Sequence, residues 1–360
     1  MRTSLKAFII NKIEFGDYGD CHRNYWKERN SMRKLLAVVA MGILFIGIAA
    51  AQRSYAQCDR QCLEGFVNQY LAAMIAHDAS RAPFATNVKF TENAKVLPLA
   101  KPIEGLWVNA TNLDSYKFYV ADPKAGQVAF VGLVKEGDKP ALLSMRLKIE
   151  NKKIREVESV VVRNMNEANL WTLKTPPSEF SRALAPEERV SREELVRISS
   201  VYFDGIVKIN SKLVPWHDEC YRLENGMWTA GPKLPPELAV HEPKSAAPPK
   251  IPGSGAAGAF GRGRCAEAFD SGVFALIESI QPRRTPVVDE ERGVTWGVYV
   301  FNHPGVETIR MPDGSIQKAA YFAGQPNSMP MSELFKIKSG KIRDIMAVGV
   351  VNAYKSGSGW

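Results

Sequence analysis

The segment that ends at Glu92 is the first place where the sequence could support chemistry. In an extended strand, alternation puts Val88, Phe90 and Glu92 on one face. A carboxylate on an apolar face is unusual, because burial penalises the charged form. A carboxyl group in such surroundings holds its proton more tightly and can exchange it near neutral pH. Glu92 is therefore a candidate general base, and a structural hydrogen bond to a neighbouring strand is the alternative.

A second carboxylate, Glu224, follows two residues after Arg222, so the two side chains share one face of a strand. A guanidinium beside a carboxylate favours the ionised form. This arrangement favours a structural ion pair. It also allows an anion-binding site, completed by Arg283 and Arg284, in preference to a base.

His217 lies in the polar run 216–219 and is a candidate acid or base, with an ordinary loop histidine as the alternative. The other histidines are scattered, without the spacing of a metal site. The sequence has no nucleophile elbow, phosphate-binding loop or dinucleotide fingerprint. We therefore expect no metal and no cofactor.

Four cysteines follow residue 57, namely Cys58, Cys62, Cys220 and Cys265. An even number suggests two disulfides, for which three pairings are possible. Cys58 and Cys62 are close enough in sequence to bridge at a helix start, and Cys220 would then pair with Cys265. Two disulfides would fit a protein outside the cytoplasm.

The N-terminal 56 residues predict export. Met32 begins a short basic start, an apolar stretch over 35–51 and then small residues, which is the pattern of a signal peptide. We expect cleavage after Ala56, a periplasmic or secreted protein, and no stable membrane insertion afterwards. An uncleaved anchor is the alternative. Residues 1–31 are interpreted as an upstream extension.

Composition excludes several classes of partner and of protein. The chain of 360 residues is 45% hydrophobic and 24% charged, as expected for a globular protein. Its net charge is +9, but residues 1–56 carry more than half of that excess. The remainder has no cluster of Lys and Arg interleaved with aromatic residues, so no nucleic-acid partner is expected.

The sequence also contains an internal repeat. Residues 147–162 resemble 335–350, and upstream segments match in the same order, including 63–78 with 195–210. This predicts a first domain over 57–162, a linker over 163–190 and a second domain over 191–360. The second copy includes residues 231–264, which are rich in Pro, Gly and Ala and are expected to be a disordered loop.

Each copy is predicted to be a helix followed by strands, an α+β design. In the first copy, apolar residues at helical spacing predict a helix over 60–77. Strands are expected near 105–121, 127–135, 141–150 and 154–162. Ser191 and Glu194 form a capping-box pattern that begins the helix of the second copy.

These patterns resemble the NTF2-like or SnoaL-like superfamily. The likeness rests on the helix in which Tyr70 precedes Asp78 by eight residues, the strand 87–93, and the hairpin around Lys153-Ile154. Over residues 58–360, the two-copy arrangement resembles a secreted domain family of unknown function. The resemblance implies two tandem NTF2-like cone-shaped barrels, each with a pocket between helix and sheet.

The resemblance also implies roles for particular residues. Glu92 matches the carboxylate base of ketosteroid isomerases, and Tyr70 their hydrogen-bond donor to a developing enolate. Tyr202 and Glu224 occupy the matching places in the second copy. The implied function is a lyase or isomerase that moves a proton on a small apolar or aromatic carbonyl compound. The alternative is a non-catalytic module that binds a small hydrophobic molecule, or a second copy of itself as a homo-oligomer.

Overall fold

The computed structural model describes residues 58–99, 102, 104–163, 165, 167–244, 263–311, 313–319 and 321–360. The expected upstream extension and signal peptide lie outside the described residues, and so does the 245–262 part of the expected disordered loop. Residues 57–360 form one compact unit. Among the helices of the described part, none is long and apolar enough to cross a membrane.

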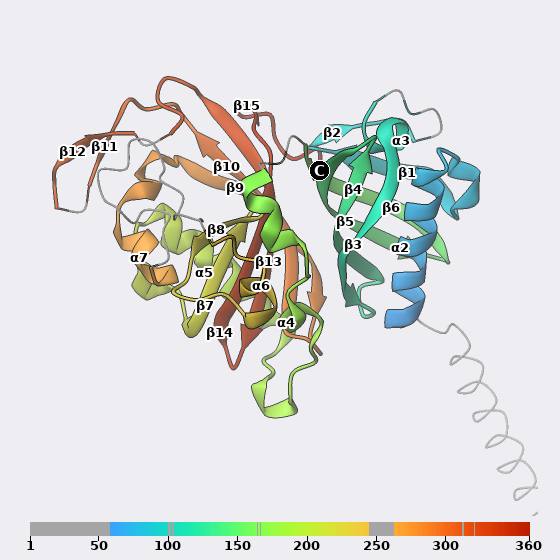
Figure 1. The fold of residues 1–360 in the computed structure, drawn as a ribbon, viewed down its shortest axis with the longest axis horizontal. Coiled ribbons are helices and arrows are strands. Elements are labelled where there is room, and N and C mark those ends of the chain that lie inside the picture. The colour runs from blue at the N-terminus through green and yellow to red at the C-terminus, as the bar shows by residue number, and fades with distance from the viewer. Residues whose placement is uncertain are drawn as a thin grey trace, which may run out of the picture. The chain divides into compact units, whose positions relative to one another are not determined.

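The first half consists of one long helix and a six-stranded sheet (Figure 1). The sheet order is β2-β1-β6-β5-β4-β3, with β1 parallel to β6 and the other neighbours antiparallel. The elements are α2 (Arg60–Ile75), η1 (Ala79–Arg81), β1 (Phe84–Glu92), β2 (Lys95–Val96), α3 (Leu106–Asn109), β3 (Ala110–Asp122), β4 (Gln127–Glu136), β5 (Lys139–Glu150) and β6 (Lys153–Val162).

The second half repeats this order with additional elements. Its main sheet runs β8-β7-β14-β13-β10-β9, with β7 parallel to β14. The matching elements are α5 (Arg192–Val207), η4 (Ser211–Leu213), β7 (Trp216–Glu224), β8 (Met227–Ala230), β9 (Ser279–Asp289), β10 (Val294–His303), β13 (Asn327–Lys338) and β14 (Lys341–Gly349). The additions are α6 (Pro236–Ala239), α7 (Cys265–Asp270), η5 (Val273–Leu276), β11 (Thr308–Arg310), β12 (Ile316–Lys318) and β15 (Asn352–Ala353).

Local geometry repeats as well as strand order. The hairpins β5–β6 and β13–β14 both shift register, because Arg155 in one and Arg343 in the other is an extra residue. The expected α+β class is therefore confirmed, with two sheet-dominated halves of the same strand order.

The two long helices, α2 and α5, each begin directly after a residue whose side chain caps the first turn. Asp59 accepts a hydrogen bond from the backbone N–H of Cys62, and Ser191 accepts one from Glu194. Helix α2 stops at Ile75, slightly before the predicted end, because the chain turns through His77 with a left-handed φ of 52°. Its buried face includes Tyr70 and packs against the sheet.

A third core lies where the outer faces of the two sheets meet. It contains side chains from both halves, such as Phe118 and Trp296, and from the predicted linker, such as Phe180. That linker holds η2 (Glu167–Leu173), α4 (Ser178–Ser181) and η3 (Pro186–Glu188). Residues 231–244, expected to be disordered, are instead folded around α6, because Leu234 and Leu238 are buried in this core.

Candidate functional site

The second half contains a cavity of about 210 Å³ between α5, its sheet and η5. Most of its lining is apolar, with aromatic rings such as Phe301 and Phe322 and methionines such as Met329. Tyr202, Arg222 and His303 are polar side chains that also line it. A mostly apolar cavity with a few polar groups is the usual form of a small-molecule site.

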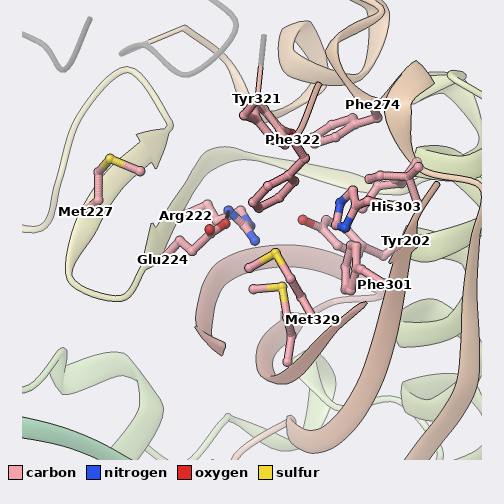
Figure 2. A pocket seen from close by; sticks show the side chains of 13 residues that line it. Tyr202, Arg222, Glu224, Met227, Phe274, Phe301, His303, Tyr321, Phe322 and Met329 are labelled. Atoms are coloured by element: carbon pink, nitrogen blue, oxygen red, sulfur yellow. Dashed lines mark hydrogen bonds and ion pairs between the residues drawn. The ribbon is translucent and has the colours of Figure 1, made fainter. Parts of the chain in front are cut away.

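Arg222 brings charge into this apolar space. Figure 2 shows its guanidinium beside the Glu224 carboxylate, near Met329 and the ring of Phe322. Its Nη1 donates to Glu224 Oε2 at 2.6 Å and to Thr229 Oγ1 at 3.1 Å. The predicted ion pair between Arg222 and Glu224 is therefore present, and it lies at the wall of the cavity.

Glu333, on β13, lies behind this pair and was missed by sequence analysis. It is fully buried, and its Oε1 lies 3.4 Å from Arg222 Nη2. Neither Glu333 Oε2 nor Arg222 Nε has a hydrogen-bond partner among the described residues. Burial raises the pKa of Glu333 to about 7, with Arg222 opposing the shift. The sequence pattern that indicated Glu92, a carboxylate on the apolar face of a strand, is also present here, since Glu333 alternates with Met331 and Phe335.

His303 lies on β10 at the same cavity and is almost completely buried. Its Nδ1 is 3.1 Å from Asn327 Oδ1, which only accepts, so Nδ1 carries the proton and Nε2 is the acceptor. Burial lowers the pKa of His303 to about 4, so the ring is neutral at pH 7.

Tyr202 extends from α5 into the same interior. Its ring packs against Trp216, Phe269 and Phe335. Burial raises the pKa of its hydroxyl well above the ordinary value, and Arg222 acts in the opposite direction. The hydroxyl is therefore a neutral hydrogen-bonding group at physiological pH.

In the first half, Tyr70 and Glu92 lie in a different environment. The Tyr70 hydroxyl accepts a hydrogen bond of 2.9 Å from Trp107 Nε1, and both rings are buried. Glu92 Oε2 accepts from the backbone N–H of Leu106 at 2.9 Å, and Oε1 accepts from Arg163 Nη2 at 2.7 Å. Both carboxylate oxygens of Glu92 therefore accept structural hydrogen bonds, and a structural role was the alternative to the role of a base.

The repeat explains why the charged cluster belongs to the second half. Aligning the matched segments places Phe90 at the position of Arg222 and Met145 at that of Glu333. Both first-half residues are buried in an apolar core. The first half thus has counterparts of Tyr202 and Glu224 but lacks counterparts of the Arg222 guanidinium and the Glu333 carboxylate.

The structure does not assemble the anion site expected from Arg222, Arg283 and Arg284. Arg283 Nη1 donates to Asp204 on α5, while Arg284 pairs with Glu158 of the first half. Adjacent residues of β9 point to opposite faces of the sheet, so the two arginines cannot act together.

His217 is also separate from the cavity lining. Its Nδ1 accepts a hydrogen bond of 3.1 Å from the backbone N–H of Glu219. Partial burial lowers the pKa of His217, which keeps the ring neutral at pH 7. These contacts are those of a histidine that orders its own strand end.

Both disulfides form, with the pairing that the sequence spacing favoured. Cys58 bonds to Cys62, and Cys220 bonds to Cys265 across a sequence separation of 45. The second bond ties β7 to α7, whose Phe269 packs against Tyr202. Disulfides are typical of an oxidising compartment. Within the described ranges, no group of His, Cys, Asp and Glu could hold a metal ion.

One family model matches the chain over residues 56–161 and 188–349, described as a domain of unknown function (DUF8021). The chain belongs to the DUF8021 family. The two matched segments of this DUF8021 chain coincide with the two halves of the same strand order, as a tandem repeat requires. No curated protein and no solved structure matches this DUF8021 chain.

Proposed function

We propose that the second half binds a small apolar or aromatic molecule in the cavity beside Tyr202 and Arg222. The observation that carries this proposal is a cavity of about 210 Å³ whose apolar walls surround one charged pair. A concave apolar surface with a few polar groups offers a small molecule both contact area and orientation.

A lyase or isomerase that moves a proton on such a molecule is the second candidate. It is favoured by the Glu224 carboxylate, which lines the cavity and meets Arg222 through Oε2, and by the neutral Tyr202 hydroxyl at the same cavity. In this proposal the base role shifts from Glu92 to Glu224, because both Glu92 oxygens are occupied and Glu224 is the carboxylate that lines the cavity. Tyr202 would then be the neutral hydrogen-bond donor.

We also propose an NTF2-like barrel for each half and an exported protein. A long helix packed on a sheet of the same order in both halves supports the first proposal. Two disulfides and the N-terminal apolar stretch support the second.

The binding proposal is tested by thermal shift of the mature protein against a panel of small aromatic and aliphatic molecules. We expect several panel members to raise the melting temperature, and Met329→Trp, which fills the cavity, to abolish the shift. Val108→Trp adds the same ring at an exposed site of the first half and should leave the shift unchanged. A panel without any stabilising member, or a shift that survives Met329→Trp, would reject the proposal.

A further inference from the structure

The cavity of the second half indicates the chemistry of its ligand, and the inference rests on the proposed binding function. We propose that the ligand is an uncharged molecule with an apolar body and one hydrogen-bond acceptor, which meets the guanidinium of Arg222. Ketones, esters, amides and ethers belong to this class. Hydrocarbons, carboxylates and ammonium ions do not.

The first support is a donor without an acceptor. A guanidinium has five N–H groups. Those of Arg222 meet Glu224 and Thr229 through Nη1, while Nη2, which has two N–H groups, makes one long contact of 3.4 Å with Glu333. Figure 2 shows the guanidinium near Phe322 and Met329, which line the cavity, so an acceptor held there would complete its hydrogen bonds.

The second support is the charge balance around Arg222. Glu224 on β7 and Glu333 on β13 already share this one guanidinium. Tyr202 on α5 and Tyr321, whose pKa values are raised by burial, are neutral neighbours in the lining, as is His303. Among the described residues that line the cavity, Arg222 is the only cation at pH 7.

At pH 8, above the pKa of Glu333, an anionic ligand would therefore add a third negative charge beside Glu224 and Glu333 without a second cation to balance it. A buried like charge is strongly disfavoured in an apolar environment. A cationic ligand would place its charge against Arg222, and an ammonium group has no acceptor for the guanidinium. A neutral acceptor avoids both penalties.

The third support is the rest of the lining, which suits a flat apolar body. Phe301, Phe322 and Tyr202 provide aromatic faces, and Met329 and Met331 provide adaptable thioethers. Phe322 also packs against His303, with ring centroids 4.9 Å apart. These side chains contribute contact area and leave Arg222 to select the polar group.

The test compares four probes of one shape on the mature protein at pH 8: acetophenone, ethylbenzene, benzoate and benzylamine. Dissociation constants come from titration followed by saturation-transfer NMR. We expect acetophenone to bind roughly tenfold more tightly than ethylbenzene, and benzoate and benzylamine more weakly than acetophenone. Equal binding of acetophenone and ethylbenzene, or a preference for either ion, would overturn the inference. If none of the four binds and the thermal-shift panel also finds no ligand, the binding function itself has failed.

A variant assigns the selectivity to Arg222. Arg222→Lys keeps a cation between the two carboxylates but removes the planar fork of N–H donors. We expect its affinity for acetophenone to fall to that for ethylbenzene, while ethylbenzene binding stays unchanged and reports an intact cavity. Retained preference for acetophenone would contradict the proposal. If the variant does not fold, the ranking of the four probes on the unaltered protein still decides the question.

Discussion

Two carboxylates compete for one guanidinium in the second half, and their surroundings separate their roles. Glu224 is partly exposed and makes a short contact with Arg222. Glu333 is fully buried and makes a contact of 3.4 Å. Burial favours the protonated form of a carboxyl group, so Glu333 is the member of the pair that can change charge near neutral pH.

Replacement of Glu333 by Gln is expected to change the pH dependence of stability. The pKa of Glu333 is about 7 in the folded protein against an ordinary value of 4.5, so its stabilising contribution is complete below pH 4.5 and is lost as pH rises through 7. Near pH 5, Gln mimics the protonated side chain and the two proteins should be similarly stable. Above pH 8, Glu333→Gln should be more stable by up to about 3 kcal/mol.

Urea unfolding at several pH values measures this difference. Asp344, another buried carboxyl whose pKa burial raises to about 7, affects both proteins alike and cancels in the comparison. Glu187→Gln, at an exposed position, should give the same difference at every pH. A difference between Glu333→Gln and the unaltered protein that does not vary with pH would show that Glu333 is ionised throughout.

Glu92 should behave as a structural carboxylate. Glu92→Gln weakens the contacts with Arg163 and the backbone of Leu106, so we expect a loss of about 1–3 kcal/mol. The hypothesis of a desolvated base predicts the opposite, with stability kept or increased. Glu136→Gln removes the other, more exposed partner of Arg163 and should cost less. Thermal melts of the two variants decide between the hypotheses.

At the scale of elements, insertions in the second copy build the walls of the cavity. The first half joins β4 to β5 by a turn of two residues, whereas residues 304–326 join β10 to β13 and include the β11–β12 hairpin (Figure 1). The backbone N–H of Gly324 donates to Gly305 O at 2.9 Å and closes this excursion at its base. Phe322, within the excursion, then reaches the cavity.

The Cys220–Cys265 disulfide, which joins β7 to α7, should stabilise the second half more than Cys58–Cys62 stabilises the first helix. The chain-entropy model assigns about 4 kcal/mol to a loop of this length. We expect Cys220→Ala with Cys265→Ala to lose stability of that order and to lose ligand binding, because α7 is released. The pair Cys58→Ala and Cys62→Ala closes a far shorter loop and should cost about half as much. Equal losses in urea unfolding would argue against the loop-length explanation.

At the scale of the whole molecule, the C-terminal residues of the second half contact the first. Trp360 Nε1 donates to Thr91 Oγ1 at 2.8 Å. The indole ring lies within cation–π distance of Lys89, Arg146 and Arg284, which belong to both halves. Arg284 and Arg146 in turn pair with Glu158, so the ring covers an ion-pair network between the sheets.

Trp360→Ala should therefore weaken the association of the two halves. The lost ring contacts and hydrogen bond predict a decrease of about 1–3 kcal/mol in the free energy of unfolding. Val351→Ala, at an exposed site of the same C-terminal segment, should change little. Calorimetry would show a lower melting temperature, or two separated transitions, for Trp360→Ala alone. An unchanged melt would mean that the sheet faces hold the halves together without this residue.

Export is the remaining prediction for the whole chain. Mass spectrometry of protein from outside the cytoplasm should find an N-terminus near Gln57, since the signal-peptide pattern ends at Ala56. A protein recovered from the cytoplasm with Met1 or Met32 at its start would contradict it.

The sequence by itself determined the features that depend on local patterns. Helical spacing predicts α2, and the capping box at Ser191 predicts where α5 begins, because capping involves neighbouring residues only. Strand alternation and the internal match predict the repeated hairpins. Strand alternation also predicts the ion pair of Arg222 with Glu224, since residues two apart share a strand face.

Only the tertiary structure decided which half has a cavity and what lines it. Trp107, far along the chain from Tyr70, donates a hydrogen bond to that tyrosine in the first half, while the second half has inserted segments around its open space. Glu333 on β13 reaches Arg222 on β7 across β14, and the sheet order that places these two strands on either side of β14 is set by the fold. Strand order and side-chain volume are long-range properties, and neither is encoded in the spacing of residues along one strand.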